Sequence, residues 1–154
     1  MTTILCATRG GASSFPNQDR AIALAQERHA QLIFLHVANV TFLNQFASPK
    51  IVDMEAELEE MGEFMLIMAE ERAEKAGITA QGVARQGGFQ QALQEVIGEY
   101  GVTAVTLGAP VHGTALTTTA YLQTLTQTLL QEHAVEVFLL HDGDIIEHHL
   151  PTPK

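Results

Sequence analysis

Short apolar runs alternate with longer amphipathic stretches along the whole chain. Five runs are apolar enough to predict strands, and they cover residues 4–8, 31–37, 78–87, 102–108 and 135–140. Between them the apolar positions recur at spacings of three and four, which predicts helices. The third run is less apolar and contains Gly82, so we expect it near an edge of the sheet. The alternation predicts an α/β fold with an open parallel sheet and helices on both faces.

The longest predicted helix carries a methionine-rich stripe. Its members are spaced by four, three, four and three residues and therefore share one face: Met54, Leu58, Met61, Met65 and Met68. We expect this stripe to pack against the sheet, because methionine fills irregular gaps in a core. The alternative is a binding surface lined by methionine.

The length of 154 residues predicts one domain over residues 1–141, followed by a polar tail over 142–154. The single cysteine, Cys6, lies in the first apolar run and excludes a disulfide within the chain. No apolar run approaches the ~20 residues that span a bilayer, and the start lacks the basic and apolar regions of a signal peptide. We therefore expect a cytoplasmic protein with no membrane partner.

The formal net charge of −10 disfavours binding to nucleic acid or to an anionic membrane. Nine of the eighteen acidic residues lie between Asp53 and Glu74, on the longest predicted helix. Such a run is typical of a solvated helix face, and a docking surface for a basic partner is the alternative.

Ligands of open α/β sheets bind beyond the carboxyl ends of the strands, where the winding direction reverses. If the first and fourth strands are neighbours, Arg9 and the glycine-containing loop over residues 108–114 meet at that point. Glycines after a strand often present backbone amides to a phosphate. However, no Lys or Arg occurs between Arg85 and Lys154.

The strand sequences ILCATRGG, FLHV and TAVTLG resemble those of the universal stress protein family, over residues 2–141. The resemblance implies a five-stranded parallel sheet of order 3-2-1-4-5 with four helices, the Rossmann-like fold of the adenine nucleotide alpha hydrolases. It also implies a homodimer built by antiparallel pairing of the last strand. The interface residues would then be Val135, Val137, Phe138 and Leu139.

One branch of the family binds ATP through an Asp after the first strand and a glycine-rich motif after the fourth. In this chain Gly113 and Thr124 match the motif, and Gly108 matches if the loop is longer. Gln123 stands where the motif has Gly, and Arg9 stands where it has Asp. The candidate residues for a nucleotide or anion are Thr8, Arg9, Val37, Gly108, Gly113, Thr114, Gln123 and Thr124.

The two departures change the chemistry of the predicted site. Gln123 adds a side chain where the backbone would approach a phosphate. Arg9 cannot accept a hydrogen bond, but it can pair with a phosphate. We therefore expect a homodimeric regulatory or interaction module with an unknown protein partner, independent of ATP and without a cofactor. The alternative is a stress protein that binds ATP or AMP through a modified phosphate loop and is at most a weak ATPase.

The sequence contains no recognisable catalytic motif and no metal-binding motif. The histidines and acidic residues of the tail, from His141 to His149, could chelate an ion, but adjacent histidines lack a framework that fixes their geometry. We therefore predict neither a catalytic residue nor a metal site.

Overall fold

The structure is a computed structural model that describes residues 2–9, 12–38, 50–109 and 119–151. The strands are β1 (Thr3–Ala7), β2 (Gln31–Ala38), β3 (Ala80–Gln86), β4 (Ala104–Gly108), β5 (Glu136–His141) and β6 (Asp144–His149). The helices are α1 (Phe15–Arg28), α2 (Lys50–Lys75), α3 (Phe89–Tyr100) and α4 (Thr119–Glu132), and a short 3₁₀ helix, η1 (Ala12–Ser14), precedes α1.

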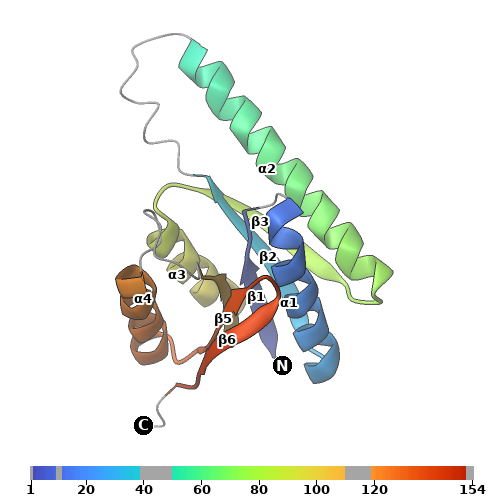
Figure 1. The fold of residues 1–154 in the computed structure, drawn as a ribbon. Coiled ribbons are helices and arrows are strands. Elements are labelled where there is room, and N and C mark those ends of the chain that lie inside the picture. Colours follow the sequence, from blue (N-terminus) through green and yellow to red (C-terminus); the bar gives the residue numbers. More distant parts are fainter. Residues whose placement is uncertain (1, 10–11, 39–49, 110–118, 152–154) are drawn as a thin grey trace.

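Within the described residues the strands form one sheet of order β3-β2-β1-β4-β5-β6 (Figure 1). Strands β1 to β5 pair in parallel, which confirms the predicted α/β class and the order 3-2-1-4-5. The weakly apolar strand β3 lies at one edge, as its composition predicted. No helix in the described part of the chain has the length and apolar character needed to cross a membrane.

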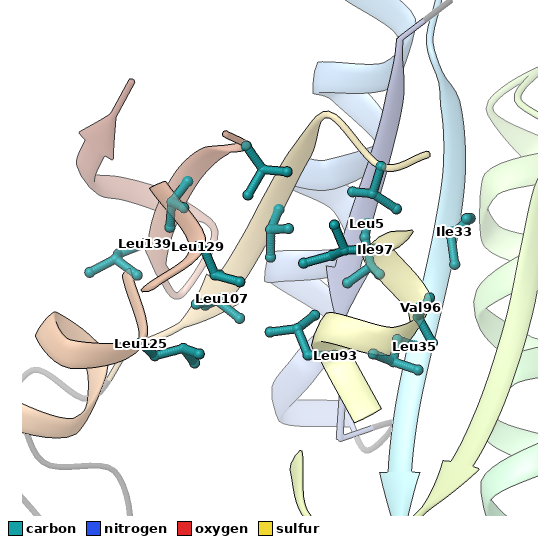
Figure 2. Close-up of a cluster of buried hydrophobic side chains, with 14 of the residues drawn as sticks. Leu5, Ile33, Leu35, Leu93, Val96, Ile97, Leu107, Leu125, Leu129 and Leu139 are labelled. Carbon is teal, nitrogen blue, oxygen red and sulfur yellow. The ribbon is translucent and has the colours of Figure 1, made fainter. Parts of the chain in front are cut away.

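The two faces of the sheet carry separate cores. Helices α3 and α4 cover one face, where Leu93 and Leu125 pack on Leu5 and Leu107 (Figure 2). Helices α1 and α2 cover the other face, where the side chains on the opposite side of each strand, such as Phe34, are buried. Because neighbouring side chains along a strand point to opposite faces, nearly continuous apolar runs supply both cores.

The structure corrects the predicted number of strands. Residues 144–149, which lie in the predicted polar tail, form a sixth strand. Strand β6 pairs antiparallel with β5 through a two-residue turn at Asp142 and Gly143. Both turn residues have positive φ angles, 47° and 84°, as the tight turns of twisted hairpins require. The Asp-Gly pair between two strand-like segments was the sequence signal for this hairpin.

The prediction that β5 forms an edge of the sheet is also wrong, since β5 is flanked by β4 and β6. The four residues assigned to a dimer interface are all buried within the chain: Val135, Val137, Phe138 and Leu139. The dimer itself stays a prediction, and in this conformation the exposed edge belongs to β6.

Side chains from three elements attach β6 to the sheet. The Glu136 carboxylate on β5 accepts hydrogen bonds from Arg28 at the end of α1 and from His148 on β6. The His148 ring stacks on Phe138 with 4.2 Å between ring centroids and 8° between ring planes. The Arg28 guanidinium lies 5.2 Å from the centroid of the same phenyl ring. The hydrogen bond from Arg28 lowers the pKa of the Glu136 carboxyl, and His148 adds to this effect.

The prediction that the methionine stripe packs against the sheet is also wrong. Helix α2 turns Gly62, Leu66, Ala69 and Ala73 toward the sheet, whereas Met61 is exposed. Met65 and Met68 are only half-buried, and the side chains of residues 54 and 58 lie outside the described part of the chain. Small residues allow the helix backbone to approach the strands closely, so they and not the methionines form the inner face.

A substitution at the hairpin turn should test the sixth strand. We expect Gly143→Ala to lower the free energy of unfolding by about 1–2 kcal/mol, the cost of a left-handed conformation for an L residue. The added Cβ would also meet the Pro16 carbonyl oxygen at 3.0 Å. The control is Gly98→Ala on α3, where no atom lies within 4 Å and φ is helical. This control should stabilise the chain by about 0.5 kcal/mol. Urea unfolding measures both, and equal effects would contradict the turn.

The Glu136 cluster should make stability depend on pH. Because the carboxyl pKa is lowered from 4.5 in the folded chain, its contribution is present above about pH 4.5 and is lost as the pH falls through the folded pKa. We expect Glu136→Gln to cost about 1 kcal/mol near neutral pH, and the difference from the parent chain should vanish in strong acid. Glu99→Gln is the control. Glu99 pairs with Arg85 and is more exposed than Glu136, so its loss should cost less. A Glu136→Gln effect that is constant with pH would rule out this linkage.

Candidate functional site

A pocket of about 630 Å³ opens at the carboxyl ends of the central strands, where β1 lies between β2 and β4. The winding direction of the sheet reverses at this point, because β1 is followed by α1 on one face and β4 by α4 on the other. Open α/β sheets have their ligand crevice at such a reversal. The predicted residues Thr8, Arg9, Val37 and Gly108 all line this pocket. Its size falls within the range of small-molecule sites.

The remaining predicted residues do not join this lining. Gln123 and Thr124 lie at exposed positions on α4, and neither is among the described lining residues. Gly113 and Thr114 lie outside the described residues. The structure therefore supports the predictions for the β1, β2 and β4 ends by position, while binding at any of these residues stays a prediction.

Several lining residues were not predicted. Ser13, Ser14 and Asn17 come from the segment that begins α1, and His141 and Asp142 come from the end of β5 and its turn. Two sequence signals could have found them. The Ser-Ser-Phe-Pro-Asn segment marks a helix start directly after the first strand. The Asp-Gly pair marks a hairpin that returns the chain beside the cleft.

One wall of the pocket is apolar. Val37, Phe89, Leu107, Tyr121 and Leu122 line it, contributed by β2, β4, α3 and α4. Phe89 is the first residue of α3, and Gly88 precedes it in an extended conformation. Such a wall can cover the flat face of a base or another planar group.

The opposite side of the pocket is suited to an anion. Arg9 is the one side chain with a permanent positive charge among the described lining residues. The hydroxyls of Ser13 and Ser14 lie at the start of α1, where the helix dipole favours negative charge. The first turn of α1 contains no acidic residue that would oppose an anion.

Buried hydrogen bonds hold the loop after β1 in place. The Thr8 amide donates to the Leu35 carbonyl at 2.9 Å, and the buried Gln18 amide donates to the Thr8 hydroxyl at 2.9 Å. The His36 Nδ1 lies 3.3 Å from the Thr8 carbonyl oxygen. Because a carbonyl only accepts, Nδ1 is the protonated nitrogen in this contact. These bonds fix the backbone from which Arg9 extends.

His141 and Asp142, at the β5–β6 turn, also line the pocket. The His141 Nδ1 lies 3.1 Å from the Ala109 carbonyl oxygen, and its Nε2 lies 3.3 Å from the Asp142 carboxylate. The turn is tied to α1, because the Gly143 amide donates to the Asn17 side chain at 2.9 Å and Arg20 donates to the Gly143 carbonyl at 2.6 Å. The tail is therefore part of the pocket wall.

Helix α2 touches the pocket through His36. Gly62 packs against the imidazole so closely that a Cβ at this position would lie 2.6 Å from the ring Cδ2. A real Cβ never comes that close to a carbon atom, so only glycine fits without movement. The position of His36 in the pocket therefore depends on a helix residue without a side chain.

Two observations bear on catalysis and metal binding at this site. Burial raises the pKa of the Cys6 thiol to about 11, so the sulfur stays protonated and is a poor nucleophile. In the described ranges, no group of three His, Cys, Asp or Glu side chains is arranged to hold a metal ion.

Known structures share this fold. A universal stress protein from Burkholderia pseudomallei is 19% identical, with a TM-score of 0.68 over 90% of this chain and 95% of that chain. A universal stress protein in complex with cAMP is 22% identical, with a TM-score of 0.61 over 92% of this chain and 97% of that chain. An Arabidopsis thaliana family protein with AMP bound is 18% identical, with a TM-score of 0.57 over 92% of each chain.

A search of curated proteins found no match. The sequence model of the universal stress protein family matches residues 1–141, which is most of the chain. The match ends at His141, where the turn into β6 begins. The chain therefore belongs to the universal stress protein family.

Proposed function

We propose that this chain is a regulatory universal stress protein whose pocket binds an adenosine monophosphate, either AMP or cAMP, and that it does not depend on ATP. The carrying observation is the pocket itself, which combines an apolar wall with a single permanent cation, Arg9. These two properties support the proposed ligand class. The output of such a module is occupancy of the site and not turnover of the ligand.

The charge of the site favours one phosphate over three. The phosphate monoester of AMP carries about −1.5 to −2 charges near neutral pH and the phosphodiester of cAMP carries about −1, so one bidentate guanidinium contact matches either. A triphosphate brings more negative charge into a chain whose formal net charge is already −10. Arg9 is the one permanent cation among the described lining residues, and Asp142 adds a negative charge to the same lining.

The apolar wall suits a nucleobase. Phe89 and Tyr121 offer aromatic surfaces, and Val37 offers a branched aliphatic surface beside them. Two proteins of the same fold were crystallised with cAMP and with AMP, which supports this ligand class. Asn17 and the His141–Asp142 pair supply polar groups that can meet ribose hydroxyls.

We also infer that the chain forms a homodimer through the exposed sheet edge, which is β6. Ile145 and Ile146 on this strand are exposed, and an uncovered strand edge with apolar side chains favours pairing with another chain. We expect Ile146→Lys to shift sedimentation toward the monomer, because a lysine on an edge strand opposes pairing. Ala84→Lys, at an exposed position on β3 at the opposite edge of the sheet, is the control. A parent chain that sediments as a monomer would contradict the inference.

Ligand titration tests the proposed function. AMP or cAMP should stabilise the purified chain. At a ligand concentration about 100 times the dissociation constant, the free energy of unfolding should rise by about 2.7 kcal/mol. ATP should bind more weakly than either monophosphate. Binding is measured by calorimetry and melting with each of the three nucleotides.

A variant of the single cation locates the ligand. Arg9→Ala should weaken monophosphate binding on the order of tenfold or more, since a hydrogen bond to a charged group contributes about 1.5–3 kcal/mol. Arg85→Ala is the control, because Arg85 pairs with Glu99 and does not line the pocket. Equal affinities for Arg9→Ala and the parent, or tighter binding of ATP than of AMP and cAMP, would reject the proposal.

A further inference from the structure

Helix α2 carries large apolar side chains on the face that points away from the sheet. Met61, Phe64 and Ile67 are 54%, 63% and 51% exposed. The three residues are three positions apart, so they form a continuous strip along one side of the helix. Scattered exposed hydrophobic residues are normal, but a contiguous strip usually marks an interaction surface. We call these three residues the α2 strip.

The packing of α2 explains why the strip stays in solvent. The opposite side of the helix is already occupied, since Leu66, Ala69 and Ala73 are buried against the sheet and α1. Figure 1 shows α2 running along the outside of the molecule beside β3, with its first turns extending beyond the sheet. The strip therefore faces away from the core of its own domain.

Acidic side chains border the strip. Glu60, Glu63, Glu71 and Glu74 are all exposed on the same helix. The nearby cation Arg72 is already engaged, because it donates to Asp19 at 2.6 Å and lies over the Phe15 ring at 4.2 Å from its centroid. The border of the strip is therefore mainly negative.

This charge decides between three occupants. A second copy of the chain would bring two acidic borders together in a protein whose formal net charge is already −10, and like charges across an interface oppose association. An anionic membrane is disfavoured for the same reason. A basic amphipathic helix can cover the strip with its apolar face while its Lys and Arg side chains reach the glutamates.

We propose that the α2 strip and its glutamate border form a docking site for a basic amphipathic helix of a partner protein. Half-buried Met65 and Met68 lie beside the strip, and methionine side chains adapt to different apolar surfaces. The site lies on the outer face of α2 and needs no ligand in the pocket. It is therefore independent of the proposed nucleotide binding.

The test uses two fluorescent peptides of about 18 residues, long enough for five helical turns. One combines Leu and Lys in an amphipathic helical pattern, and the other has Glu in place of every Lys. Fluorescence anisotropy measures the binding of each peptide to the full chain. We expect the Lys peptide to bind and the Glu peptide to bind at least tenfold more weakly.

Matched variants separate this site from general attraction to an acidic protein. Phe64→Ser should weaken binding of the Lys peptide about tenfold, the usual effect of losing an aromatic anchor. Leu150→Ser is the control, because Leu150 is similarly exposed at 67% but lies beyond β6. The double variant E60Q/E71Q should weaken binding more than E95Q/E99Q on α3, although both remove two negative charges.

The outcomes are decisive in each direction. Weaker binding for Phe64→Ser alone, with unchanged melting and unchanged sedimentation of the free chain, supports the docking site. Equal binding by the Phe64 and Leu150 variants, or equal effects of the two Glu pairs, overturns it. If Phe64→Ser instead dissociates a self-assembled species, the strip is covered by a second copy and the proposal fails.

Discussion

Strand β1 pairs with β2 on one side and with β4 on the other, and this pairing sets how the whole chain winds. The chain builds the sheet outward from β1 in one direction through β2 and β3, and then returns to its other side with β4. Each crossover helix must then cover the face on its own side, which gives the two separate cores. Because α1 after β1 and α4 after β4 cover opposite faces, a cavity opens at the carboxyl ends of the central strands.

Charge defines what this cavity can hold. The protein as a whole is acidic, yet the described pocket lining has one guanidinium, one carboxylate and two imidazoles. The serine hydroxyls and the start of α1 add favourable dipoles on the side of the cation. The charged side chains of the pocket lining therefore nearly balance one another, whereas the protein as a whole is acidic. The pocket is not a basic surface. This balance of charge is the basis of the proposal that the pocket binds a singly phosphorylated ligand.

Much of the fold could be predicted from the sequence, because strand runs and helical spacing are local patterns. The five parallel strands followed from the alternation of apolar runs with helical spacing, and the edge position of β3 followed from its weaker apolar character and Gly82. The side of α2 that packs on the sheet could not be predicted in this way. Met61 and Met65 form a periodic stripe, but Ala69 and Ala73 form an equally periodic one. Periodicity identifies a stripe without saying which one approaches the sheet. Only the close fit around small residues decides, and that depends on the strands underneath.

The candidate site divides in the same way. Thr8, Arg9, Val37 and Gly108 lie at or just beyond the carboxyl ends of strands, so the sheet topology brings them together. His141 and Asp142 are not among the pocket residues predicted from the sequence, although the Asp-Gly dipeptide after β5 indicates a hairpin that would place them there. The position of Gln123 and Thr124 along α4 depends on where that helix begins. A gapless motif alignment does not contain this information.

The glycine at the inner face of α2 links two parts of the molecule that otherwise have separate neighbours. The imidazole of His36 occupies the space that a methyl group on Gly62 would need. A larger residue there would force either the ring into the cavity or the helix away from the sheet. The volume of the cavity and the distance of the helix from the strands are therefore linked through the contact between residue 62 and His36. A substitution at residue 62 would change one or the other, so both features restrict which residue this position can accept.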